Sequence, residues 1–295
     1  MSIRSIRNEH LSKLAGSYLF PVIAKRKAEF LKERPDAKLI SMGMGDTTQP
    51  LPQVIADSIA NFAKGMATPE GYCGYHPPIQ KEVATKISQL FYPPGAVKPD
   101  EVFMSDGSKC DLARLQQLWS SNCKVALQDP AYPVYVDDTV IAGRTGNYNS
   151  STGFYDGICY MPCNAENNFF PDLSVAENCD ILVFCNPNNP TGAVADRAQL
   201  EKLVKFCSER KILLLYDAAY ARYITDPNLP RSIFEIDGAR KIAIETNSFS
   251  KLAGFTGMRL GWTVIPDEVE YQDGRKLKDD FSRMYAIFLL YFDII

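Results

Sequence analysis

A lysine stands close behind two serines and ahead of a glycine-rich run that contains an arginine. The segment reads Ser248-Phe249-Ser250-Lys251-Leu252-Ala253-Gly254-Phe255-Thr256-Gly257-Met258-Arg259-Leu260-Gly261. A lysine shielded from water can form a Schiff base with an aldehyde, and hydroxyl and guanidinium groups can donate hydrogen bonds to a phosphate. The segment therefore predicts a site for a phosphorylated aldehyde, with Lys251 as the reactive amine. A short Ser-x-Ser-Lys alone would more simply be a solvated loop, and the length of the run favours the site.

A carboxylate ends the most apolar segment of the chain. Asp217 follows Ile212-Leu213-Leu214-Leu215-Tyr216, and a carboxylate in such surroundings has to be paired or hydrogen-bonded to offset its desolvation. A protonated pyridine nitrogen is a suitable partner, because this pairing keeps the ring able to accept electrons. Taken alone, Asp217 could equally be a helix cap or a surface turn.

Three more side chains could bind the same ring. Asn189 lies in Asn-Pro-Thr-Gly, where proline fixes the backbone, so its amide could be held toward a ligand oxygen, although the segment could be only a turn. Tyr220, three residues after Asp217, could donate to the same oxygen. Tyr132 in Asp129-Pro130-Ala131-Tyr132-Pro133 could stack on the ring face. With 15 tyrosines in the chain, either tyrosine alone is more simply explained by ordinary packing.

A possible anion site precedes a helical pattern. Gly107-Ser108-Lys109 follows an expected strand and opens the periodic series Leu112, Leu115, Leu118. Backbone N–H groups at the start of a helix bind anions through their geometry and the helix dipole. The alternative, a serine that only caps the helix, is equally compatible with the sequence.

The elements that must position these residues alternate between strand and helix patterns from about residue 38 onward. This alternation predicts an α/β fold with a mostly parallel sheet sandwiched by helices, whose ligands bind beyond the carboxyl ends of the strands. The expected strands are 101–105, 124–128, 181–185, 211–217, 241–246 and 261–265. The expected helices are 52–65, with Val54, Ile55, Ile59 and Phe62 on one face, 78–92, with Ile79, Val83, Ile87 and Leu90, and 196–210, with Leu200, Leu203, Val204 and Cys207.

The composition favours a small-molecule ligand and a cytoplasmic protein. The 295 residues include 32 basic and 35 acidic side chains, so the charge gives no reason to expect nucleic acid or a membrane as a partner. The N-terminus lacks the apolar core of a signal peptide. The apolar run 285–292 is far shorter than the roughly 20 residues that cross a bilayer.

The sequence gives little support for a metal site, a serine nucleophile or a nucleotide-binding loop. Eight cysteines include no C-x-x-C pair, and two histidines, His10 and His76, cannot supply an H-E-x-x-H site, so no metal is expected. A G-x-S-x-G elbow and a Walker loop are also missing from the sequence.

Together these motifs resemble those of the class I/II aminotransferases of fold type I, and more narrowly those of the LL-diaminopimelate aminotransferases. The narrower resemblance rests on segments 45–51, 105–109, 128–133 and 247–251 and extends from about Tyr18 to about Met284. It implies pyridoxal 5'-phosphate as cofactor, amino acid and 2-oxo acid substrates, and a homodimer. The implied reaction transfers an amino group between LL-2,6-diaminopimelate and 2-oxoglutarate in lysine biosynthesis.

The resemblance also implies roles for individual residues. Lys251 becomes the catalytic residue, which binds the cofactor aldehyde and shuttles a proton, and Asp217 becomes the partner of the pyridine nitrogen. Asn189 and Tyr220 would bind the ring oxygen, and Tyr132 would stack on the ring. The implied phosphate contacts are Ser108, Lys109, Ser248, Ser250, Arg259 and Tyr75, the last reaching across from the other subunit. The implied substrate contacts are Tyr18, Gly45, Lys109, Tyr132 and Asn189.

The resemblance divides the chain into three parts. These are an N-terminal arm with part of a small domain at 1–45, a cofactor-binding large domain at 46–280, and a divergent tail at 281–295. The family's Thr-Thr-Phe-Asn-Gly stretch, with an asparagine that contacts the ligand, is replaced by residues 285–292. We expect the small domain to be incomplete, and a transaminase needs that domain to hold its substrate and exclude water.

Two alternatives remain open at the level of sequence. The general motifs also fit an aminotransferase for aspartate, an aromatic amino acid or kynurenine. The altered tail also fits a catalytically inactive remnant that binds the cofactor or a partner. Segment 45–51 favours an enzyme, whereas the altered tail favours the remnant.

Overall fold

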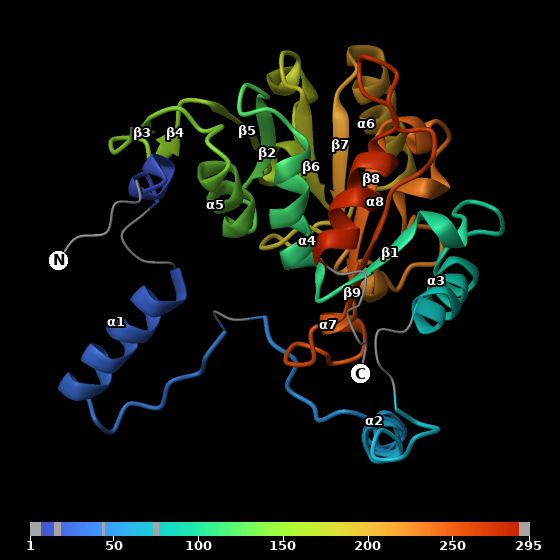
Figure 1. Ribbon diagram of the computed structural model, residues 1–295. Helices are drawn as coiled ribbons and strands as arrows, with labels where there is room; N and C mark the ends of the chain where they lie inside the picture. Colours follow the sequence, from blue (N-terminus) through green and yellow to red (C-terminus); the bar gives the residue numbers. More distant parts are fainter. Residues whose placement is uncertain (1–6, 15–18, 43–44, 73–76, 289–295) are drawn as a thin grey trace.

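The computed structural model describes residues 7–14, 19–42, 45–72 and 77–288, and its centre is a seven-stranded sheet (Figure 1). The strand order is β1-β9-β8-β7-β6-β2-β5. Strands β5, β2, β6, β7 and β8 are parallel, and β9 is antiparallel to both β8 and β1. The bounds are β1 Val102–Ser105, β2 Val125–Asp129, β5 Ile158–Pro162, β6 Ile181–Cys185, β7 Leu213–Asp217, β8 Ala243–Ser248 and β9 Gly261–Val264, with a separate ribbon of β3 Tyr148–Asn149 and β4 Phe154–Tyr155.

Helices cover both faces of this sheet, which confirms the predicted α/β sandwich. In Figure 1, α4, α5 and α8 lie in front of the sheet and α6 lies behind it. The helix bounds are α1 Leu19–Glu33, α2 Gln53–Gly65, α3 Pro77–Phe91, α4 Ser108–Leu115, α5 Pro133–Ile141, α6 Arg197–Arg210, α7 Phe249–Leu252 and α8 Leu277–Phe288.

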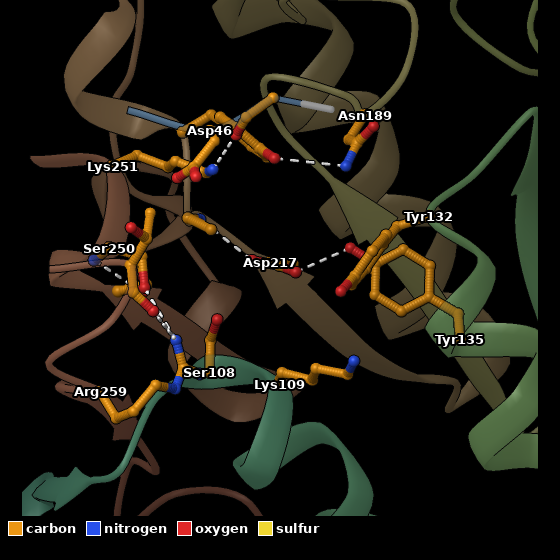
Figure 2. A pocket seen from close by; sticks show the side chains of 15 residues that line it. Asp46, Ser108, Lys109, Tyr132, Tyr135, Asn189, Asp217, Ser250, Lys251 and Arg259 are labelled. Carbon is orange, nitrogen blue, oxygen red and sulfur yellow. Dashed lines mark hydrogen bonds between the residues drawn. The ribbon is translucent and has the colours of Figure 1, made fainter. Parts of the chain in front are cut away.

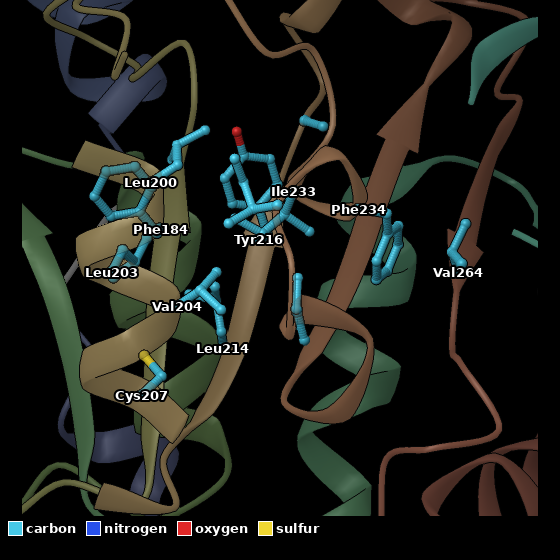
Figure 3. Close-up of a cluster of buried hydrophobic side chains, with 14 of the residues drawn as sticks. Phe184, Leu200, Leu203, Val204, Cys207, Leu214, Tyr216, Ile233, Phe234 and Val264 are labelled. Carbon is cyan, nitrogen blue, oxygen red and sulfur yellow. The ribbon is translucent and has the colours of Figure 1, made fainter. Parts of the chain in front are cut away.

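The side chains of the central strand β7 alternate between two hydrophobic cores. Leu214 and Tyr216 pack in one core with Leu203 of α6, as Figure 3 shows. Leu215, which lies between them in sequence, belongs to the opposite core with Leu115 of α4. Successive side chains of a strand point to opposite faces, so a strand covered on both sides has to be apolar throughout. This is why β7 reads as an unbroken apolar run.

The expected strands and helices are all present, with ends that shift by one or two residues. The strand expected at 211–217 begins later because Lys211 has a φ of 58° and closes α6 in the left-handed conformation. Two residues of the expected apolar faces are exposed to solvent, since Val54 is 71% exposed and Leu90 is 73% exposed. Helical periodicity identifies an apolar face, but it does not show how far another element covers that face.

The last described helix joins the body of the protein. Helix α8 runs across position 281, where the sequence suggested a domain boundary, and it places Phe281 and Tyr285 in the core. Both rings meet Phe103 of β1 edge-on, with centroid separations of 5.0 and 5.3 Å. Within the described ranges, no helix combines the length and the apolar character needed to cross a membrane. The three-part domain division itself stays a prediction.

A buried carboxylate joins the segment before β1 to the segment before β8. Glu101, which precedes β1, is fully buried, and both of its oxygens accept hydrogen bonds from Arg240, at 3.0 and 2.6 Å. Arg240 also pairs with the more exposed Glu268 at 2.6 Å. A buried ion pair that loses one partner leaves an uncompensated charge away from water.

We predict that Arg240→Ala lowers the free energy of unfolding by about 3–5 kcal/mol, because buried Glu101 would lose both short hydrogen bonds to the guanidinium and keep only the more distant Lys98 amine, at 3.8 Å. Urea unfolding followed by circular dichroism measures this loss. Arg197→Ala is the matched control, because Arg197 pairs with Glu235 at 3.6 Å near the surface and should cost about 1 kcal/mol or less. Equal losses in the two variants would contradict a special role for the buried pair.

Candidate functional site

A cavity of about 360 Å³ opens at the carboxyl ends of the parallel strands (Figure 2). Small-molecule sites typically enclose about 300–1,000 Å³ and lie at this edge of such sheets. The walls come mainly from segments that follow β1, β2, β6, β7 and β8. The lining residues are Gly45, Asp46, Ser108, Lys109, Tyr132, Tyr135, Asn189, Asp217, Ala219, Tyr220, Ser248, Ser250, Lys251, Thr256 and Arg259.

Asp217 brings a buried carboxylate to this cavity. It ends β7 and is only 3% exposed, so the alternative of a surface turn is wrong. The Tyr135 hydroxyl donates to Oδ2 at 2.7 Å, and the Ala219 N–H donates to Oδ1 at 3.0 Å. Burial raises the pKa of Asp217, whereas these hydrogen bonds act in the opposite direction by favouring the carboxylate. Among the described residues, no cationic side chain contributes to the pKa of Asp217.

Lys251 reaches the same cavity from the short helix α7. Ser248 caps this helix, because its Oγ accepts a hydrogen bond from the Ser250 N–H at 3.0 Å. The Lys251 amine donates to the backbone carbonyl of Gly45. The segment that contains Gly45 therefore lies against the amine, and Figure 2 shows Lys251 and Asp217 at the same hollow.

The start of α4 forms a third wall. Gly107 is the N-cap of α4, with a φ of 116°, so the alternative of Ser108 as a simple capping serine is wrong. A Cβ at position 107 would collide with the guanidinium of Arg259. A Cβ on Gly261 of β9 would lie 2.9 Å from the Ser108 backbone nitrogen. Position 107 needs glycine because its φ lies in a region that other residues rarely adopt, and position 261 needs glycine because neighbouring backbone lies too close for a side chain.

Arg259 is held beside this helix start in an uncommon backbone conformation. Its φ is 61°, which costs a residue other than glycine on the order of 1–3 kcal/mol. Its Nη1 donates to the Ser250 Oγ at 3.3 Å and to the Thr256 carbonyl at 3.1 Å. Helix N–H groups, two serine hydroxyls and a guanidinium therefore lie around one part of the cavity, and this is a donor set for a phosphate.

Two polar groups and two aromatic rings complete the walls. The Asn189 amide donates to the Tyr220 hydroxyl at 3.2 Å, and burial raises the pKa of Tyr220 to about 12. Tyr220 therefore keeps its proton at neutral pH and can donate to a ligand. The rings of Tyr132 and Tyr135 meet edge-on, with centroids 5.7 Å apart.

The structure brings together every predicted site residue that it describes. Tyr18 and Tyr75 lie outside the described residues. The residues that line the cavity without having been predicted include Tyr135, Asp46 and Thr256. Tyr135 had one available signal, because it follows Tyr132 by three residues at a helix start marked by Pro133.

Comparisons with known proteins point to one family. The family model for class I and II aminotransferases matches residues 37–281. LL-diaminopimelate aminotransferases named as chloroplastic, from Arabidopsis thaliana and, as a probable one, from Oryza sativa subsp. japonica, are each 51% identical over 94% of this chain. The solved structure of an L,L-diaminopimelate aminotransferase from Chlamydomonas reinhardtii superposes with a TM-score of 0.89 at 51% identity, covering 97% of this chain and 70% of that one.

The chain spans 60% of the length of these two plant relatives. The matched region includes the whole central sheet and every residue that lines the cavity. The family model thus covers well over half of the chain. The protein belongs to the class I and II aminotransferase family.

Proposed function

We propose that the cavity binds pyridoxal 5'-phosphate, the cofactor of this family, and that the protein transfers an amino group between LL-2,6-diaminopimelate and 2-oxoglutarate in lysine biosynthesis. The observation that carries the proposal is one cavity lined by a buried carboxylate, an amine and a set of phosphate donors. Relatives that bear the diaminopimelate aminotransferase name support the choice of substrate.

The donor chemistry fits each part of the cofactor. Ser108, Lys109, Ser248, Ser250 and Arg259 supply neutral and cationic donors for the phosphate, and Tyr75 of a second subunit is a further proposed contact. Asn189 and Tyr220 suit the ring oxygen, and Tyr132 suits the ring face. The buried carboxylate of Asp217 lacks a cationic partner among the described residues, and a protonated pyridine nitrogen would supply one.

The bound cofactor would accept the electron pair that is left on the alpha carbon of the substrate when a bond there breaks. Asp217 would hold the proton of the ring nitrogen in place. Lys251 Nζ would bind the aldehyde and, once the substrate amine has displaced it, act as the base that moves a proton at the alpha carbon. Gly45, Lys109, Tyr132 and Asn189 would orient the substrate, together with Tyr18, which lies outside the described residues.

We also propose a homodimer in the cytoplasm with no nucleic-acid or membrane partner, and the division 1–45, 46–280 and 281–295. The balanced charge supports the expectation about partners. The two plant relatives are named as chloroplastic. Microscopy of the tagged protein tests the proposed cytoplasmic location.

Lys251→Ala should abolish the visible absorbance band of protein-bound pyridoxal phosphate, because no amine would remain to bind the aldehyde at this position. Lys205→Ala is the control, since Lys205 is an exposed partner of Glu209 on α6. Absorbance spectra of the two reconstituted variants make the test. A persistent band in Lys251→Ala would remove Lys251 from its proposed role.

Arg259→Gln should weaken the binding of pyridoxal phosphate by roughly tenfold or more, the size expected for a lost hydrogen bond to a charged group. Glutamine removes the guanidinium but keeps a polar side chain at this position, whose φ is 61° in the structure. Binding of pyridoxal, which lacks the phosphate, should be nearly unchanged. Fluorescence titration with both ligands tests this, and equal weakening of both would argue against a phosphate contact.

A substrate panel separates the proposed reaction from its alternatives. Incubation with 2-oxoglutarate and LL-diaminopimelate, aspartate, phenylalanine or kynurenine should give most glutamate with LL-diaminopimelate. Preference for another donor would change the substrate assignment. Cofactor binding without transfer to any donor would favour the inactive remnant.

A further inference from the structure

Tyr135 contacts the central carboxylate of the cavity, although no step proposed above uses it. Its side chain is 4% exposed, and its hydroxyl donates to Asp217 Oδ2 at 2.7 Å. The two residues are 82 positions apart in the sequence, so the contact exists only because the fold brings the start of α5 to the end of β7. The hydrogen bond to Asp217 gives Tyr135 a role beyond hydrophobic packing.

The start of α5 fixes the place of Tyr135. Tyr132 is the N-cap of this helix, Pro133 is its first residue, and the Tyr135 N–H donates to the Tyr132 carbonyl at 3.1 Å. Residues three apart in a helix share a face, and the two rings meet edge-on with an interplanar angle of 88°. One helical turn thus carries both the ring proposed to stack on the cofactor and the donor to Asp217.

The two tyrosines and the cysteine that face Asp217 remain neutral at physiological pH. Burial raises the pKa of Tyr135 well above its usual value, and it raises the pKa of the Cys185 thiol as well. Tyr220 has a pKa of about 12 for the same reason. The charged groups that line the rest of the cavity are Asp46, Lys109, Lys251 and Arg259. Tyr135 is therefore a protonated donor, and its hydrogen bond favours the charged form of Asp217.

Both oxygens of Asp217 already accept one hydrogen bond each, from Tyr135 and from the Ala219 N–H. These two donors fix the rotation of the carboxylate. A carboxylate has about four acceptor positions, so lone pairs remain for a donor in the cavity.

We infer that Tyr135 is a positioning residue, which holds Asp217 charged and correctly turned for the nitrogen of the cofactor ring. This inference rests on the proposed function, because it assigns Tyr135 a task only if the ring binds beside Asp217. The proposed role of Tyr135 acts through Asp217 and involves no contact with the reacting atoms.

The test compares two ligands in one variant of the 295-residue chain. The ligands are pyridoxal phosphate and its deaza analogue, in which a C–H group replaces the ring nitrogen. Tyr135→Phe removes a single oxygen, and it should weaken the binding of pyridoxal phosphate by roughly tenfold or more. Binding of the deaza analogue should not weaken, because this ligand has no nitrogen for Asp217 to hold.

Tyr216→Phe is the matched control, since it removes another buried hydroxyl, one that accepts a hydrogen bond from Asn186 at 2.8 Å. It should leave the ratio of the two affinities unchanged. Equal weakening of both ligands by Tyr135→Phe, or no weakening, would overturn the inference and leave the proposed function standing. A wild-type protein that binds neither ligand would overturn the proposed function and the inference with it.

A second variant covers the case in which Tyr135→Phe does not fold. The Tyr135→Phe and Asp217→Asn double variant lacks the buried charge and should fold. If Tyr135 acts through Asp217, this double variant should bind pyridoxal phosphate as Asp217→Asn alone does. Weaker binding by the double variant would show an effect of Tyr135 that does not pass through Asp217 and would contradict the inference.

Discussion

The cavity is organised by the need to satisfy a carboxylate that is buried at the end of the central strand. Asp217 accepts hydrogen bonds from a phenol and a backbone N–H, but among the described residues no cation offsets its charge. Taking a carboxylate out of water costs several kcal/mol unless it is paired. A cationic nitrogen on a ligand would pair with Asp217. The other walls of the cavity would then bind the remaining parts of the same ligand.

The topology of the sheet brings the other residues of the site around Asp217. Five parallel strands end at one edge, and the two antiparallel pairings of β9 make β1 run in the same direction as they do. The phosphate donors on α4, the turn that holds Asn189, and the helix that carries Lys251 therefore meet around Asp217. Gly107 and Gly261 permit the close approach of α4, β9 and Arg259 that this convergence requires.

The fold and most of the site could be predicted from the sequence because the signals are local. An apolar run that ends in Asp217 marks both a buried strand and the group at its end, and the rule for parallel sheets places such groups together. The bond from Tyr135 to Asp217 could not be predicted in this way, since it depends on how α5 packs and the chain has 15 tyrosines. The exposure of Val54 and Leu90 was missed for a related reason: periodicity does not reveal what covers a helix face.

The proposed site requires one aromatic ring to lie between the side chains of Lys251 and Asp217. A crystal structure of the protein with pyridoxal phosphate tests it most directly. We expect the ring nitrogen at about 2.7–2.9 Å from a carboxylate oxygen of Asp217, the phosphate at the start of α4, and the aldehyde carbon bonded to Lys251 Nζ. A ring bound elsewhere, or one whose nitrogen faces away from Asp217, would contradict it.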